Sequence, residues 1–423
     1  WDTYNIYLQK SGWQDITNKV LASLHYENRT EQLDEEISKA LYGETIRASV
    51  SRMELFHSCP FSHYAQYGLR LRERQVFRLE APDIGELFHA ALKYITETVM
   101  HKDLQWSDMT REQCELLAKE AVELLAPKLQ HEILLSSNRY FYIKRKLEQI
   151  ISRASFIMGE HAKASGFTPV GLEMSFGPSG DWPSLSFPLK NGSMMELVGR
   201  IDRVDQAKGE KTGSYLRIID YKSSEKDVNI NEVYYGLSLQ MLTYLDIVIA
   251  HSEELIGMKA DPAGVLYFHV HNPMINSSKM LGLDEIEKGI LKKFKMKGLL
   301  LGEENVVRLM DKSLTTGDSP IISAGFNKDG SLSKRSKVAD KAEFNYLRQF
   351  VRSKYIKTGN QMTGGQVEIS PYKLKERTPC TFCSFKSICQ FDESLETNTF
   401  RLLDEKPRDE VLTRIREEAE KDA

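Results

Sequence analysis

The chain has 423 residues, of which 41% are hydrophobic and 28% charged, values typical of a folded globular protein with one large domain or a few smaller ones. No apolar run approaches the length of a membrane span and no signal peptide is visible, so we expect no membrane-spanning helix and no membrane partner. The net charge of −3 excludes a uniformly basic protein, although a basic groove within a neutral protein remains compatible with it. Because the chain begins with Trp1 rather than Met, we expect a fragment of a longer protein.

The first part of the chain is predicted to be helical. Residues 1–47 hold two helix-like segments and are interpreted as the tail of a preceding domain. The strongest helix is predicted at 83–99, where apolar residues recur at helical spacing. His89 lies on or beside that apolar face, and taken alone it is interpreted as a packing residue. Further helices are predicted at 111–129 and 138–165.

From residue 168 the pattern changes to that of strands. The order of elements is a helix, three strands, a helix and a strand, with one short extra strand in between. This order predicts an α/β protein with a mixed central sheet flanked by helices. Strands are predicted at 169–176, 185–189, 194–205, 214–222 and 263–270, and the helix before the last strand at 231–250.

The C-terminal part is predicted to return to helices. Residues 284–311 are interpreted as helical and basic at their start, and 312–340 as an exposed excursion rich in Gly, Ser, Asp and Lys. A helix is predicted at 341–357, followed by a strand or extended arm at 360–374. The alternating charges within 396–423 predict a solvated helix.

The predicted hairpin at 194–222 carries the chemistry. Asp202 lies on its first strand, and Asp220 and Lys222 lie two apart on its second, so that the last two side chains share one face. Placing these charges at the end of a buried apolar strand is unfavourable and needs a functional reason. Two carboxylates and a lysine suit metal-assisted hydrolysis of a phosphodiester, because carboxylates bind Mg2+, or Mn2+ or Ca2+ in its place.

Four short motifs follow one another along the chain, and each consists of two residues at a fixed spacing. They are Gly85 with His89, Gly199 with Asp202, Asp220 with Lys222, and Gln240 with Tyr244. This set and its order resemble the RecB-like branch of the PD-(D/E)XK nuclease superfamily. The resemblance changes the interpretation of His89, which becomes an expected metal ligand.

The resemblance also implies roles for the other motif residues. Lys222 is expected to position water or to stabilise the charged transition state, while Gln240 and Tyr244 orient the DNA backbone. Glu173 on the preceding strand is interpreted either as a supporting group behind the site or as a salt-bridged core residue. The implied metal ligands are His89, Asp202, Asp220 and the backbone carbonyl of Tyr221.

Cysteines form a second signal. The chain has five, an odd number that argues against a disulfide framework, and three of them, Cys380, Cys383 and Cys389, have the spacing of metal ligands. Cys59 is the better candidate for a fourth ligand because it follows a predicted helix, whereas Cys114 has the surroundings of an ordinary helix residue. The residues alone leave zinc and a [4Fe–4S] cluster open.

The resemblance favours the cluster, because some RecB-like nucleases carry an iron–sulfur staple between their N- and C-terminal segments. It implies that Cys59, Cys380, Cys383 and Cys389 hold a structural [4Fe–4S] cluster. Closing so long a loop restricts the unfolded chain. The expected organisation is a tail of a helicase-like domain at 1–47, a stapled nuclease domain at 48–395 and a solvated helix at 396–423.

The functional expectation is a nuclease subunit of a bacterial helicase–nuclease complex. The resemblance implies a Mg2+-dependent exodeoxyribonuclease in the cytoplasm, paired in a heterodimer with an AddA-like helicase–nuclease subunit. It would process double-strand DNA ends for recombinational repair, receiving unwound single-stranded DNA and cutting the 5′-ended strand. The alternative is a non-catalytic scaffold for DNA binding or assembly that keeps the structural cluster.

Overall fold

The computed structural model describes the whole chain apart from residues 1, 2, 4, 5, 8, 9, 11, 25–29, 75, 103, 210–212, 396, 397, 422 and 423. The chain divides into two compact units, each built from separate stretches of sequence. The first, here called the cysteine unit, comprises Trp1–Glu44, Leu55–Glu73 and Thr358–Glu405. The second, here called the sheet unit, comprises Thr45–Glu54, Arg74–Lys357 and Lys406–Ala423.

The described part of the sheet unit contains an eight-stranded sheet in which β1-β4-β5-β6-β7-β10 are neighbours and β2 and β3 also pair with β4. β4 pairs antiparallel with β5, and β5 pairs parallel with β6, so the predicted mixed sheet is confirmed. The strands are β1 (Thr45–Ser49), β2 (Thr168–Phe176), β3 (Leu185–Pro188), β4 (Met194–Lys208), β5 (Ser214–Lys222), β6 (Ala260–His269), β7 (Lys297–Leu301) and β10 (Val338–Ala339).

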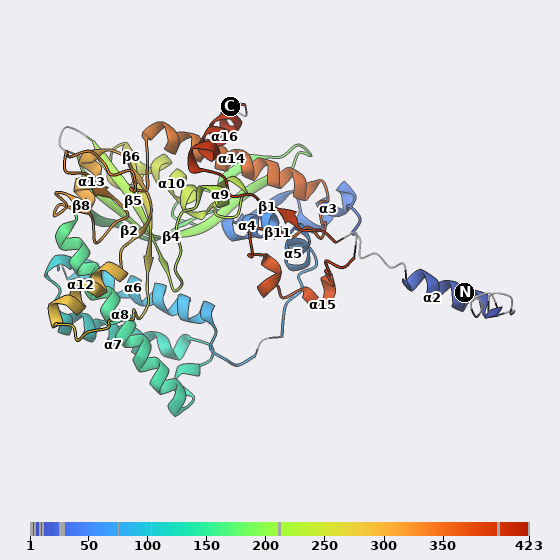
Figure 1. Cartoon of the computed structure of the whole chain (residues 1–423), viewed down its shortest axis with the longest axis horizontal. Helices are drawn as coiled ribbons and strands as arrows, with labels where there is room; N and C mark the ends of the chain where they lie inside the picture. The colour runs from blue at the N-terminus through green and yellow to red at the C-terminus, as the bar shows by residue number, and fades with distance from the viewer. Residues whose placement is uncertain are drawn as a thin grey trace. The chain divides into compact units, whose positions relative to one another are not determined.

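Helices cover the sheet on both sides (Figure 1). The long helices α6 (Ala81–His101), α7 (Arg111–Leu125) and α8 (Asn138–Ala164) gather on one side, as their predicted positions require. On the other side lie α10 (Gln240–Ala250) and α16 (Arg408–Lys421). α6 buries Leu87, Leu92 and Ile95 completely, because these residues recur every three or four positions and so share one helix face.

Two predicted helices are interrupted in the structure. The helix expected at 231–250 is α9 (Ile230–Tyr234) followed by α10, with Gly236 at a left-handed φ of 77° between them. The helix expected at 284–311 is wrong in its middle, where β7 lies between α12 (Leu283–Lys293) and α13 (Glu304–Met310). A short apolar run such as that of β7 has no periodicity that separates a buried strand from a buried helix.

Other boundaries also differ from expectation. Residues 45–49 form β1, which pairs parallel with β4, so the boundary expected between 47 and 48 falls inside a strand. The excursion at 312–340 is not fully exposed, since Ile322 and Phe326 are buried beside the short strands β8 (Gly317–Asp318) and β9 (Gly325–Phe326). The expectation of a solvated C-terminal helix is wrong for one face of α16, which buries Val411, Ile415 and Ala419.

The cysteine unit contains α2 (Gln14–Leu24) and α3 (Glu35–Tyr42), which confirm two predicted helices as far as residue 24. Residues 25 and 26 of the first predicted helix lie outside the described residues. The strand expected at 360–374 is shorter, because α14 (Lys341–Thr363) continues to residue 363 before β11 (Tyr372–Lys373) pairs parallel with β12 (Arg401–Leu402). α5 (Pro60–His63) begins with a proline, whose fixed φ suits the first helical position.

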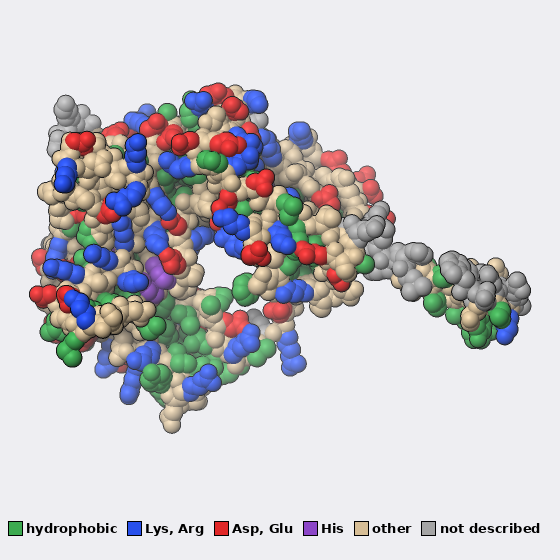
Figure 2. Space-filling view, viewed as in Figure 1, with side chains coloured by type: hydrophobic (Ala, Val, Ile, Leu, Met, Phe, Trp, Pro, Cys, Tyr) green, Lys and Arg blue, Asp and Glu red, His purple; other side chains and the backbone are tan. Residues whose placement is uncertain are grey.

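The surface is mixed in charge. Figure 2 shows Lys and Arg side chains interspersed with Asp and Glu side chains on the face in view, in keeping with a net charge of −3. Among the described helices, none combines the length and apolar character needed to cross a bilayer. Any preference for a charged partner must therefore come from local groups.

Candidate active site

Asp202 is held between a helix and the neighbouring strand. Its Oδ2 lies 3.2 Å from Nδ1 of His89 on α6. The same oxygen accepts a hydrogen bond of 2.9 Å from the backbone N–H of Tyr221 on β5. The predicted pairing of His89 with Asp202 is thus present in the structure, and both side chains are fixed on regular elements.

Glu173 on β2 joins this pair. The ligand atoms of His89, Glu173 and Asp202 all lie within 4.8 Å of one another. Glu173 Oε2 is 2.5 Å from Arg200 Nε, whereas its buried Oε1 has no hydrogen-bond partner among the described residues. Glu173 also adopts a φ of 49°, a left-handed conformation that is costly for a residue with a side chain and that is often found at functional sites.

Sequence reasoning left the role of Glu173 open, although strand register contains the missing signal. β2 and β4 pair antiparallel, with Leu172 opposite Arg203 and Met174 opposite Ile201. This register places Glu173 opposite Asp202. Two carboxylates directly opposite each other repel, so the pair indicates a site that a cation would stabilise.

Asp220 and Lys222 lie beside these groups on β5. The Asp220 carboxylate is almost fully buried, with Oδ2 at 2.6 Å from Lys222 Nζ and Oδ1 without a hydrogen-bond partner in the described part of the chain. Burial raises the pKa of Asp220 to about 6, the charge of Asp202 adds to the rise, and Lys222 opposes it. Asp220 is outside the set of atoms within 4.8 Å of one another, although its charge acts on His89.

The site carries an excess of negative charge. Burial works to lower the pKa of His89, but the hydrogen bond and charge of Asp202 and the charge of Asp220 outweigh it, so the net pKa is raised. Burial first, and the Asp202 charge second, raise the pKa of Glu173. Oxygen-rich donor sets with unpaired buried carboxylate oxygens suit hard divalent cations, so these residues fit a metal of the Mg2+ type.

Gln240 and Tyr244 are joined as their spacing predicts. Gln240 Nε2 donates a 3.1 Å hydrogen bond to the Tyr244 hydroxyl. Gln240 is the first residue of α10, and the Glu54 carboxylate accepts from the backbone N–H groups of Leu239 at 2.7 Å and Gln240 at 3.1 Å. Glu54, on α4 (Val50–Ser58), therefore fixes the start of the helix that carries both motif residues. Its distance along the chain explains why sequence reasoning missed it.

The four predicted cluster cysteines lie in the cysteine unit. Cys59 is buried with Phe385, and Cys383 and Cys389 pack against the same apolar group. Burial raises the pKa of the Cys389 thiol to about 11, and the charges of Cys59, Cys380 and Cys383 add to the rise. Such thiols become thiolates when a positive group binds them, so this donor set fits a metal ion or cluster.

The fifth cysteine behaves differently. Cys114 is fully buried on α7, within the sheet unit, and burial raises its pKa to about 11. It packs as a small apolar residue on a helix face, as its sequence surroundings predict.

Comparison with known proteins agrees with this geometry. Residues 47–390 match the family model of the PD-(D/E)XK nuclease superfamily. A relative from Bacillus licheniformis, a subunit of an ATP-dependent helicase/deoxyribonuclease, is 57% identical over 422 residues, which cover 100% of this chain and 36% of the relative. The protein of the same name from Bacillus subtilis strain 168 is 56% identical over 420 residues, covering 99% and 36%.

The chain thus spans 36% of the length of these relatives. The superfamily match covers most of the chain, and the predicted motifs occur on the mixed sheet and helices described above. The resemblance inferred from the motifs is confirmed, and the chain belongs to the PD-(D/E)XK nuclease superfamily.

Proposed function

We propose that this chain is a metal-dependent deoxyribonuclease module that hydrolyses phosphodiester bonds in single-stranded DNA. The observation that carries the proposal is the close set of His89, Glu173 and Asp202, with the buried Asp220 and its partner Lys222 beside it. Unpaired carboxylate oxygens in this set would be unfavourable without a cation. A purely structural sheet has no need for such a group.

His89, Glu173 and Asp202 would hold the cation, and Asp220 and the Tyr221 carbonyl are the further donors expected from the family motif. When bound, Mg2+ or Mn2+ supplies positive charge that offsets charge developing on the phosphate and acidifies water. Lys222 adds a fixed ammonium beside the carboxylates, where it can orient the attacking water or stabilise the transition state.

Gln240 and Tyr244 would position the DNA backbone. Their side chains are linked to each other and lie on a helix whose first turn is fixed by Glu54. A polar pair held in this way can orient a phosphate without rearrangement during the reaction.

We also propose that the module works in an AddAB-type complex, as the AddB-like part beside an AddA-like helicase–nuclease subunit. The names of the relatives, which combine a helicase and a deoxyribonuclease, support this. The module would receive unwound DNA from double-strand ends in the bacterial cytoplasm and cut the 5′-ended strand as an exonuclease for recombinational repair.

A structural [4Fe–4S] cluster held by Cys59, Cys380, Cys383 and Cys389 completes the proposal. Tetrahedral zinc, with Zn–S bonds of about 2.3 Å, would draw its sulfur atoms to within about 3.8 Å of one another. Among the described residues, no three of these thiols lie within 4.8 Å of one another, which favours a larger group.

Cleavage of a labelled single-stranded oligonucleotide by the purified chain in Mg2+ or Mn2+ tests the proposed activity. We expect cleavage by the wild type, none with EDTA, and almost none by Asp220→Ala. Asp261→Ala is the matched control, since Asp261 also pairs with a lysine but lies at the opposite end of the β5–β6 pairing. Normal cleavage by Asp220→Ala would refute the site, and an inactive wild type would favour the scaffold alternative.

A further inference from the structure

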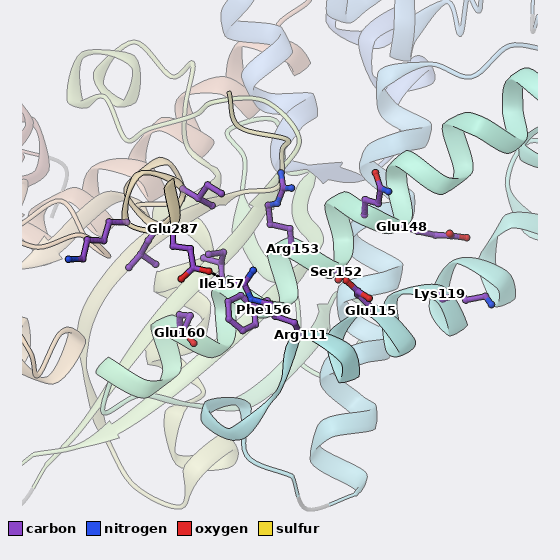
Figure 3. Close-up of a pocket in the computed structure, with 14 residues that line it drawn as sticks. Arg111, Glu115, Lys119, Glu148, Ser152, Arg153, Phe156, Ile157, Glu160 and Glu287 are labelled. Carbon is purple, nitrogen blue, oxygen red and sulfur yellow. Dashed lines mark hydrogen bonds and ion pairs between the residues drawn. The ribbon is translucent and has the colours of Figure 1, made fainter. Parts of the chain in front are cut away.

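Two cavities of the sheet unit lie away from the candidate active site. One, of about 770 Å3, lies among α7, α8 and α12 and is lined by charges of both signs. Figure 3 shows Arg111 and Glu287 facing each other across it, and their ion pair measures 2.6 Å. Arg111 also lies over the ring of Phe156, 4.5 Å from its centre. The charges of this cavity are therefore already matched within the protein.

The second cavity, here called the basic cavity, has a volume of about 450 Å3 and differs in charge. Its charged lining residues are Arg203 on β4, Arg217 on β5 and Lys312, and no acidic side chain lines it within the described part of the chain. Side chains alternate along a strand, so Arg203 and Arg217 point to the face opposite Asp202 and Asp220.

The two arginines share a single carboxylate. Asp205, which is fully buried, accepts hydrogen bonds of 2.6 Å from Arg203 Nε and 2.9 Å from Arg217 Nη2. Arg217 is 3% exposed, yet its Nη1 has no hydrogen-bond partner among the described residues. Two buried guanidinium groups and one carboxylate leave one positive charge in excess, an arrangement that is unfavourable unless something neutralises it.

Further polar groups of the basic cavity are also unused. The indole N–H of Trp106 and Nε2 of His161 are buried, and neither has a hydrogen-bond partner in the described structure. Trp106 Nε1 can only donate. The cavity wall also contains Phe167, whose ring centre lies 4.6 Å from Arg217 Cζ, and Phe268. Unsatisfied donors beside aromatic walls are the features of a pocket for an acceptor-bearing organic ligand.

We propose that the basic cavity binds a small organic anion. Its phosphate or carboxylate would accept from Arg217 and from the Trp106 indole, and its apolar body would lie against the aromatic wall. Guanidinium groups recognise both kinds of oxyanion in a forked geometry. The volume lies within the range of small-molecule pockets. The site is separate from the proposed metal centre, because it uses the opposite face of β4 and β5.

The test is binding to the full chain in EDTA, measured by thermal melting and calorimetry, so that nuclease activity plays no part. The probes are deoxyadenosine 5′-monophosphate for the phosphate source and benzoate for the carboxylate source, with uncharged deoxyadenosine as the control. We expect at least one anionic probe to raise the melting temperature with concentration and the control to leave it unchanged. No rise with either anion, or an equal rise with deoxyadenosine, would overturn the proposal.

Two variants locate the binding. Arg217→Met should weaken it about tenfold or more, the loss expected for a hydrogen bond to a charged group. Arg308→Met is its matched control, because Arg308 also lies over a phenylalanine ring, at 4.4 Å, but outside the basic cavity. Ala162→Leu should block binding by filling the cavity without touching the buried ion pairs, and it decides the question if Arg217→Met does not fold. Unchanged binding in Ala162→Leu would overturn the proposal.

Discussion

Glu173 and Asp202 face each other from adjacent antiparallel strands, and their ligand oxygens lie within 4.8 Å of one another. The two carboxylates repel each other, and His89 lies against one of them. Arg200, which is largely exposed, pairs with only one oxygen of Glu173. The fold therefore holds an unfavourable electrostatic arrangement that a bound cation would relieve.

Glu173→Gln tests this relationship. Replacing one carboxylate removes a ligand and part of the repulsion, so the metal-free protein should melt no lower than the wild type, whereas stabilisation by Mn2+ should largely disappear. We expect Mn2+ affinity to fall at least about tenfold, since even residues behind metal ligands change affinity by about 10–100-fold. Titration calorimetry and thermal melting measure both effects.

The control for that experiment is Glu196→Gln. Glu196 is also a strand glutamate paired with an arginine, at 3.4 Å from Arg47, but it lies outside the metal-ligating set. Its replacement should leave Mn2+ binding unchanged. Equal Mn2+ affinity in the Glu173 and Glu196 variants would contradict a ligand role for Glu173.

Glu54→Ala should disturb the start of α10. Removing the carboxylate leaves the N–H groups of Leu239 and Gln240 without their acceptor, which costs about 1 kcal/mol for a helix cap. Because Gln240 then loses its fixed position, the cleavage rate should fall as well. Denaturant unfolding and single-turnover cleavage measure the two losses.

Glu54→Gln serves as the conservative variant. Burial raises the pKa of Glu54, so an uncharged group is tolerated there, and the amide oxygen of glutamine can still accept from the helix N-terminus. It should restore most of the stability and rate lost in Glu54→Ala. If both variants behave like the wild type, Glu54 has no positioning role.

The motif residues could be predicted from sequence because their spacing is short. Asp220 with Lys222, and Gln240 with Tyr244, lie within one strand or one helix turn, and the structure places each pair in contact. The role of Glu173 depends instead on how β2 aligns with β4, and sequence alone does not determine that register.

Elements were misassigned for related reasons. β7 is a buried apolar run between two helices, and pairing with β6 makes it a strand. Gly298 shows what that pairing requires: a side-chain Cβ there would lie 2.0 Å from the Val265 carbonyl oxygen, so only glycine fits. Long-range contacts of this kind override the local pattern from which helices are predicted.

His161 gives the protein a defined pH dependence. Burial, with the charges of Arg217 and Arg203, lowers its pKa to about 3, against an ordinary value near 6.5. Below pH 6.5 the unfolded chain binds a proton that the folded chain does not, so stability should fall by about 1.4 kcal/mol per pH unit towards pH 3. Above pH 6.5 this contribution is constant.

His161→Gln should reduce the loss of stability between pH 7 and pH 5 in denaturant unfolding. His101→Gln is the control, because His101 is an exposed residue at the end of α6. An identical pH dependence in wild type and His161→Gln would show that His161 does not titrate as described.

Cys380→Ala tests the proposed cluster. Loss of one of four thiolate ligands should remove the iron and the visible absorption of the purified protein and should lower its melting temperature, since ligand binding stabilises the folded state. Cys114→Ala is the control and should keep both iron and colour. Zinc in place of iron in the wild type would support the zinc alternative, and normal iron and melting in Cys380→Ala would contradict the staple.

The central claim is a metal centre formed by His89, Glu173 and Asp202. Anomalous scattering from crystals of the chain grown with Mn2+ tests it most directly. We predict a manganese peak within coordination distance of all three side chains, and no peak there in Asp202→Ala crystals. Manganese bound only elsewhere, with these side chains unliganded, would contradict the account.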